Sequence, residues 1–163
     1  MIKRILIVGI LIFSTLGLVA QENMNNQKLG TILYVMSDTI AGNLGAWQFI
    51  VNGVPMLCFT DEVNNRMRII SPVKKVEELT DEEMKASMEA NFHSALDVRY
   101  AIAEDLVWVA FIHPLAELTK EQAVDAVKQV YNAVMTFGAS YSSTELVFPK
   151  SKEEEPERKI KRN

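Results

Sequence analysis

The feature that most constrains this sequence is an uninterrupted apolar run of seven residues, Leu106 to Ile112. Its length fits a β-strand, and a strand with two apolar faces must be covered on both sides. A helix of the same chain is one expected cover. A second copy of the chain is the other, with a long loop or the first helix as the alternative. We therefore expect a homodimer whose interaction surface uses one face of this strand, among Trp108, Phe111, Val107 and Val109.

Four other segments have the pattern of strands. Trp47 to Val51 and Val54 to Thr60 are rich in aromatic and branched residues, and the Asn52-Gly53 pair between them suits a type I′ hairpin turn. Arg66 to Ile70 follows and is expected to end at the serine and proline after it, which completes a meander of three strands. Leu96 to Ile102 alternates apolar and polar residues, as a half-buried strand does.

Three segments predict helices. In the first, Asn26 to Ala41, apolar residues recur at helical spacing before a stretch with two glycines, which are typical of a helix end. Each of the other two begins with a capping box, in which a residue and the one three positions later exchange hydrogen bonds: Thr80 with Glu83, and Thr119 with Gln122. The apolar residues of the middle helix recur every four positions and are expected to form its buried stripe: Met84, Met88 and Phe92.

The resulting order α-β-β-β-α-β-β-α predicts an α+β domain, an antiparallel sheet with helices packed on it. We expect this single domain to span residues 21–149, with a short extra strand at Glu145 to Phe148. The tail, residues 150–163, is charged and lacks aromatic residues and periodicity, so we expect it to be disordered.

Residues 1–20 have the layout of a secretory signal peptide. Lys3 and Arg4 form a basic head, an apolar stretch runs from Ile5 to Val19, and Ala20 precedes a polar run. That stretch is shorter than the about 20 residues that comfortably span a membrane, although a retained anchor is the alternative. We expect cleavage after Ala20 and a protein that is exported, periplasmic or secreted, without stable membrane insertion after cleavage.

The charge of the chain argues against two classes of partner. After cleavage, residues 21–163 would carry 15 basic and 21 acidic residues, a net charge of −6. An acidic protein repels phosphate backbones and acidic lipid surfaces, so we expect no nucleic-acid partner.

The residue types that carry chemistry are few. Cys58 is the only cysteine and lies in an apolar run, which favours a buried core side chain. His93 and His113 are the only histidines, and with Asp97 they show no metal-ligand spacing. Asp97 and Arg99 share a strand face and predict a surface ion pair or, alternatively, a pair that grips a ligand. We therefore expect no catalytic residue, metal or cofactor; the alternative is a small hydrolase or metal-dependent enzyme using Cys58, His93 or His113.

Several short strings, together with the order of the elements, resemble one family. They are Trp47 to Gly53 with Phe59-Thr60-Asp61, Asn64 to Arg68 before Pro72, Glu89-Ala90-Asn91, Trp108, Pro114, Leu118-Thr119 and Phe137-Gly138. These residues resemble the YbjN-type proteins, whose fold is that of type III secretion chaperones. The resemblance implies a small acidic domain, usually dimeric, without catalytic residues, and it covers about Leu29 to Phe148. Chaperones of that fold bind extended client segments along hydrophobic patches on the sheet and the first helix. Those chaperones are cytosolic, whereas the layout of residues 1–20 predicts export for this chain.

These observations predict an exported, non-enzymatic binding module that holds a protein or peptide segment. The enzyme that would use the cysteine or the histidines is the alternative. A third interpretation is a structural subunit of the cell envelope, whose acidic face organises cations or neighbouring proteins.

Overall fold

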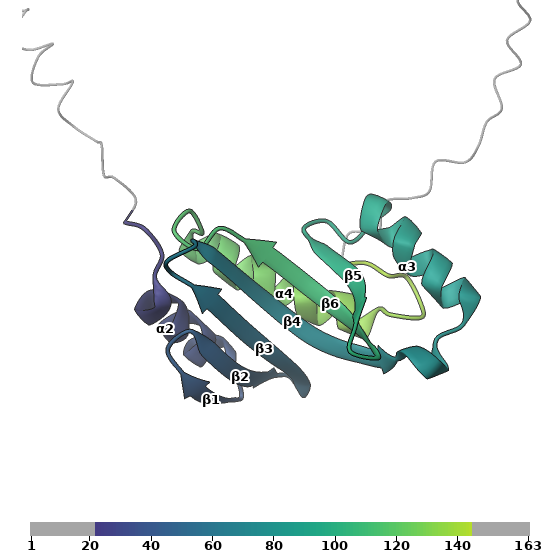
Figure 1. Cartoon of the computed structure of the whole chain (residues 1–163), viewed down its shortest axis with the longest axis horizontal. Coiled ribbons are helices and arrows are strands. Elements are labelled where there is room, and N and C mark those ends of the chain that lie inside the picture. The colour runs from purple at the N-terminus through teal and green to yellow at the C-terminus, as the bar shows by residue number, and fades with distance from the viewer. Residues whose placement is uncertain (1–21, 145–163) are drawn as a thin grey trace, which may run out of the picture.

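The computed structural model describes residues 22–144, and Figure 1 shows how their elements are arranged. Six strands and three α-helices follow one another, with one 3-10 turn before the second helix. In chain order they are α2 (Asn26–Met36), β1 (Thr39–Asn43), β2 (Ala46–Val51), β3 (Val54–Asp61), β4 (Arg66–Lys75), η1 (Val76–Glu78), α3 (Asp81–His93), β5 (Val98–Ala103), β6 (Leu106–His113) and α4 (Lys120–Met135).

The strands form one antiparallel sheet in the spatial order β1-β2-β3-β4-β6-β5, which confirms the predicted α+β class. The β2–β3 hairpin turns at Asn52 and Gly53, where φ is 48° and 82°. Positive φ at both positions is what a type I′ turn requires, so the predicted hairpin is confirmed. β6 lies inside the sheet, between β4 and β5.

The helices are divided between one face of the sheet and its two ends. Figure 1 shows α4 crossing behind the sheet, with α2 near β1 at one end and α3 beside β5 at the other. α4 packs on β4, β5 and β6 and also touches α2. Its buried side carries mostly small and branched side chains, which let the helix lie close to the strands: Ala123, Ala126, Val127, Val130 and Ala133.

β6 has one face in the core and one on the open side of the sheet. Val107, Val109 and Phe111 are buried in the core. Trp108 and Ile112 alternate with them and therefore point to the opposite face, where Ile112 is 65% exposed. Only the face that carries Trp108 can therefore meet another chain without unpacking the core.

Both predicted capping boxes are present. The Thr80 hydroxyl accepts from the Glu83 N–H at 3.2 Å, and the Glu83 carboxylate accepts from the Thr80 N–H at 3.0 Å. Thr119 and Gln122 make the same exchange at 3.0 and 2.8 Å. The start of each helix is thus fixed by residues next to it in the sequence.

The end predicted for the first helix was wrong. α2 stops at Met36, and residues 39–43 instead form the edge strand β1, which pairs with β2 from Thr39↔Ile50 to Asn43↔Ala46. Ser37 has already left the helix, with extended backbone at φ −102° and ψ 148°. Ile40, which fits the helical spacing, contacts the same core from the strand, because a partner strand lies beside this segment.

The end predicted for the third strand was also wrong. β4 continues past Ile70 to Lys75, and Pro72 lies within it opposite Trp108. The register shifts between Pro72 and Lys74, and such an irregular position tolerates a residue that has no N–H. The short strand predicted at 145–148, the tail at 150–163 and the signal peptide at 1–20 lie outside the described residues.

The buried stripe predicted for the middle helix was wrong. The buried residues of α3 are Ser87 and Ala90, whereas Met84, Met88 and Phe92 are exposed. The small side chains let the helix approach the sheet, and Ser87 turns its hydroxyl back to the Glu83 carbonyl at 2.8 Å. Helical spacing identified an apolar stripe on α3, but the helix packs on the sheet edge with a different stripe of small side chains.

Candidate protein-binding surfaces

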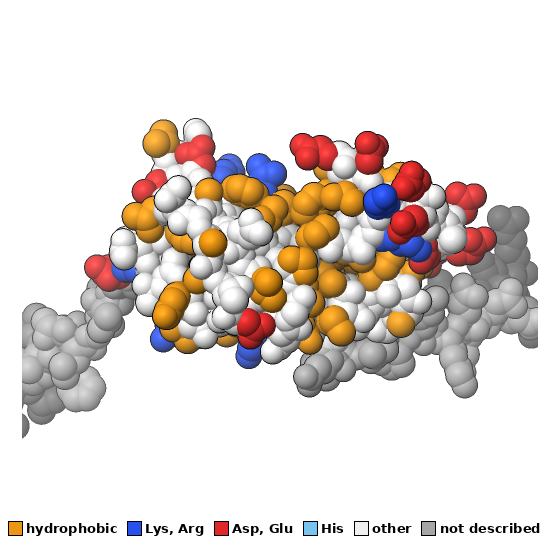
Figure 2. Space-filling model, turned by 90° about the horizontal axis from the view of Figure 1, so that it is seen from below, with side chains coloured by type: hydrophobic (Ala, Val, Ile, Leu, Met, Phe, Trp, Pro, Cys, Tyr) orange, Lys and Arg blue, Asp and Glu red, His pale blue; other side chains and the backbone are white. Residues whose placement is uncertain are grey.

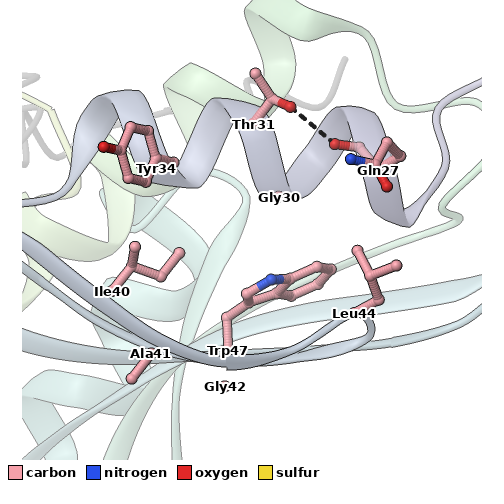
Figure 3. Close-up of a pocket in the computed structure, with 9 residues that line it drawn as sticks. All are labelled: Gln27, Gly30, Thr31, Tyr34, Ile40, Ala41, Gly42, Leu44 and Trp47. Carbon is pink, nitrogen blue, oxygen red and sulfur yellow. Dashed lines mark hydrogen bonds between the residues drawn. The ribbon is translucent and has the colours of Figure 1, made fainter.

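A groove of about 330 Å³ lies between α2 and β1. Figure 3 shows Trp47 between the helix and the strand, with Tyr34 on α2 and Ile40 and Leu44 on the strand side. Trp47 is only 7% exposed, whereas Tyr34 and Leu44 are 71% and 63% exposed. The groove therefore joins a buried aromatic floor to exposed apolar walls, and it can take an apolar side chain from another molecule.

Gly30 explains how α2 comes so close to the groove floor. A Cβ atom built at Gly30 would lie 3.2 Å from Cζ2 of Trp47, closer than side-chain contacts normally are. Glycine in the middle of a helix lowers helix propensity, so its position here reflects close packing on the indole. The sequence pattern did not predict a role for Gly30 or Tyr34, although a glycine inside a helical pattern is a usable signal of close approach.

The two edges of the sheet differ. Among the described residues no strand pairs with the outer side of β1, so its backbone edge is available to an added strand. At the other edge the Asn91 side chain on α3 pairs with the backbone of Tyr100 on β5. Its carbonyl oxygen accepts from the Tyr100 N–H at 2.8 Å, and its amide donates to the Tyr100 carbonyl at 3.1 Å.

The open face of the sheet is also apolar. Exposed Ile50, Phe59 and Ile112 lie on β2, β3 and β6, and half-buried Leu57, Ile70 and Trp108 lie between them. Cross-strand pairing joins Leu57 to Ile70 and Ile70 to Ala110, which makes the surface continuous across three strands. The Trp108 indole is held in place by a hydrogen bond from Nε1 to the Ala103 carbonyl at 3.0 Å.

A third apolar surface lies on α3. We call Met84, Met88 and Phe92 the α3 ridge; their side chains are 38%, 52% and 87% exposed. In Figure 2, the view from below, acidic side chains gather toward the end of the molecule where Figure 1 places α3. Hydrophobic side chains are spread across the middle of the same view.

The helix that bears the ridge is fixed to β4 by an ion pair. The Lys74 ammonium lies 2.8 Å from the Glu83 carboxylate, which also caps α3. The hydrogen bond from Lys74, helped by the Thr80 N–H, holds the pKa of Glu83 below its usual value.

The residues that carry chemistry are placed as follows. Cys58 is fully buried in β3, and burial raises the pKa of its thiol to about 12. His93 is exposed at the C-terminal end of α3, in edge contact with Phe92. His113 ends β6 and stacks on Phe111 with 6.0 Å between ring centres. Within residues 22–144 no group of three histidine, cysteine or acidic side chains could hold a metal ion.

Asp97 and His113, two of the predicted ligand candidates, line a second cavity of about 240 Å³, which His93 does not line. The ion pair predicted between Asp97 and Arg99 does not form. Arg99 donates instead to the backbone carbonyls of Leu96 and Val98. Asp97 accepts from the buried Gln129 amide at 3.0 Å, and Gln129 also donates to Asp125 at 2.7 Å. These contacts connect α4 to the residue that precedes β5.

None of the helices in the described part of the chain is long and apolar enough to cross a membrane. No protein-family model matches the sequence, and no curated protein is similar to it.

Three solved structures are similar in fold. A chain of the HopA1–SchA chaperone–effector complex matches with a TM-score of 0.53 and 10% identity, over 69% of this chain and 94% of that one. A chain of the ExsC–ExsE complex matches with a TM-score of 0.52 and 13% identity, over 68% and 92%. A chain of the complex of the Yersinia pestis type III secretion chaperone SycH with a stable fragment of YscM2 matches with a TM-score of 0.51 and 10% identity, over 69% of this chain and 98% of that one. The chain therefore has the fold of the type III secretion chaperones.

Proposed function

We propose that this protein is an exported, non-enzymatic binding module that holds an extended segment of another protein. The observation that carries the proposal is the groove between α2 and β1, where the apolar floor at Trp47 lies beside a sheet edge that no strand of residues 22–144 covers. An extended segment can add its backbone to β1 and insert alternate side chains into the groove. The solved structures of similar fold are complexes of chaperones with effectors or with a protein fragment, which supports the same kind of partner.

Two observations support a role without catalysis. The Cys58 thiol is buried and its pKa is about 12, so it is not a thiolate at neutral pH. His113 stacks on Phe111, and its Nδ1 lies 2.7 Å from the Pro114 carbonyl, so both contacts are local. Export is supported by the signal-peptide layout of residues 1–20.

A peptide titration tests the groove. The probe is a short peptide of alternating leucine and serine with lysine at both ends, and a Trp108→Phe background leaves Trp47 as the single tryptophan. We expect saturable binding that shifts the Trp47 emission. Tyr34→Asp and Leu44→Asp should each weaken binding on the order of tenfold, because each replaces an apolar wall with a charge.

Val63→Asp is the matched control, since Val63 is 95% exposed in the turn after β3 and does not line the groove. It should leave the affinity unchanged. Absence of binding, or equal weakening by all three aspartates, would remove the groove as the client site.

We also propose a homodimer, and the α3 ridge supports it best. Its residues are more exposed than Trp108, and two such helices can pack their ridges against each other by a two-fold axis. Apolar patches of this kind mark interaction sites in soluble proteins. Sedimentation equilibrium of the mature chain should show a dimer that Phe92→Asp dissociates and Trp108→Glu does not. A wild type that stays monomeric at high micromolar concentration, or a dimer lost only with Trp108→Glu, would contradict this interface.

A further inference from the structure

The α3 ridge is a line of apolar side chains in an acidic setting. Met84, Met88 and Phe92 are four residues apart, so they follow one another along a single side of the helix. Three exposed acids, Asp81, Glu82 and Glu89, lie on the same helix, and Lys85 pairs with Glu89 at 3.9 Å. A segment that covers the ridge should therefore be apolar in one part and basic in another.

The described chain ends beside this ridge. The Ser143 N–H donates to the Ser94 carbonyl at 3.2 Å, and the Ser94 hydroxyl donates to the Tyr141 carbonyl at 2.8 Å. Ser94 is the C-cap of α3, two residues after Phe92. The chain is thus fixed at the C-terminal end of the helix, at the end of the ridge where Phe92 is most exposed.

The residues that follow Thr144 match the ridge in order and in length. Leu146 and Phe148 come first in the sequence and would share one side if the segment were extended, and Lys150 and Lys152 come next. α3 has 13 residues, about 20 Å at 1.5 Å per residue. Six residues of extended chain cover about 20 Å at 3.3 Å per residue. An antiparallel path would therefore place the apolar pair over the ridge and the lysines near the acidic first turn.

We propose that the segment Glu145 to Lys152 lies along the α3 ridge of its own chain and competes there with a second copy. Leu146 and Phe148 cover Phe92 and Met88, and the lysines meet the acids at the start of the helix. The competition rests on the proposed homodimer, because the segment and the second copy would cover the same α3 ridge. Self-association is then set by the balance between the chain's own segment and the partner's ridge.

Disulfide trapping in the full chain tests the docking. The chain carries Cys58→Ala, Glu89→Cys beside the ridge and Val147→Cys, which leaves the contacting side chains intact. We expect an intramolecular disulfide that forms on the order of tenfold faster than in the same chain with Leu146→Ser and Phe148→Ser. The tether is identical in both chains, so only the apolar contact differs. Equal rates, or a disulfide mainly between two chains, would overturn the proposal.

Sedimentation equilibrium tests the competition. With Cys58 intact, Leu146→Ser and Phe148→Ser should tighten the dimer on the order of tenfold, because they free the ridge. An unchanged or weaker dimer would overturn the competition. If neither chain associates while the trapping rates still differ, the proposed homodimer fails and the docking of the segment stands.

Discussion

The side-chain amide of Asn91 pairs with both backbone groups of Tyr100, as a neighbouring strand would. The two hydrogen bonds, of 2.8 and 3.1 Å, saturate the outer side of β5 at its centre. A sheet edge closed in this way cannot accept another strand at that position. Among the described residues the β1 edge has no such cover, so it is the edge of the sheet that stays open to an added strand.

Asn91→Ala should lower the free energy of unfolding by about 1–3 kcal/mol, because two polar backbone groups lose their partners. Urea denaturation followed by circular dichroism measures the change. Asn91→Asp keeps the acceptor for the Tyr100 N–H but loses the donor to the Tyr100 carbonyl. Its free energy of unfolding should therefore lie between those of the alanine variant and the wild type. An alanine variant as stable as the wild type would show that water replaces the amide without cost.

The two capping boxes should each contribute measurably. Thr80→Ala and Thr119→Ala should each cost about 1 kcal/mol, because each leaves a helix N–H without its acceptor. Midpoints of urea unfolding report the difference. Ser140→Ala, at an exposed position after α4, is the control that should change little. Unchanged midpoints in both threonine variants would contradict the capping role.

Cys58 should resist alkylation by iodoacetamide in the native protein and react once urea unfolds it. Burial raises the pKa of its thiol from 9.0 to about 12. Between these values the unfolded thiol loses its proton while the folded thiol keeps it. The protonated Cys58 thiol therefore contributes fully to the free energy of unfolding below pH 9, and this contribution is lost as the pH rises toward 12.

That loss amounts to at most about 1.4 kcal/mol for each pH unit. Urea midpoints at pH 8 and pH 10 should fall more steeply in the wild type than in Cys58→Ala, which has no thiol to titrate. Rapid labelling of the folded protein, or identical slopes, would mean that solvent reaches the thiol.

Neighbouring positions of β6 should respond oppositely to a charge. Phe111→Glu should prevent folding, because it places a carboxylate in the core beneath α4. Ile112→Glu, one residue later and 65% exposed, should fold normally. Circular dichroism and the thermal transition separate the two outcomes. A folded Phe111→Glu protein would contradict the assignment of the two faces.

The exported protein should begin at Gln21. The basic head, the apolar stretch and Ala20 together favour cleavage at that bond. Mass analysis of the N-terminal peptide from the native protein measures the site. A soluble cytoplasmic species that retains Met1 would refute export, and a membrane-bound one would identify the retained anchor instead.

The sequence by itself determined the features that depend on near neighbours. Thr80 and Thr119 start their helices because each partner is three residues away, and Asn52-Gly53 reverses the chain because both residues tolerate positive φ. The apolar run Leu106 to Ile112 predicted a strand with one face in the core, and Val107, Val109 and Phe111 lie there.

Only the tertiary structure decided the features that depend on distant partners. Residues 39–43 became a strand because β2 lies beside them, although Ile40 fits the helical pattern equally well. α3 turned Ser87 and Ala90 inward because the sheet edge leaves little space, which exposed the ridge of methionines and Phe92. The groove over Trp47 joins α2 to β1, and no local pattern places those two elements together. Periodicity reveals that a stripe is apolar, but contacts far along the chain decide whether that stripe is core or surface.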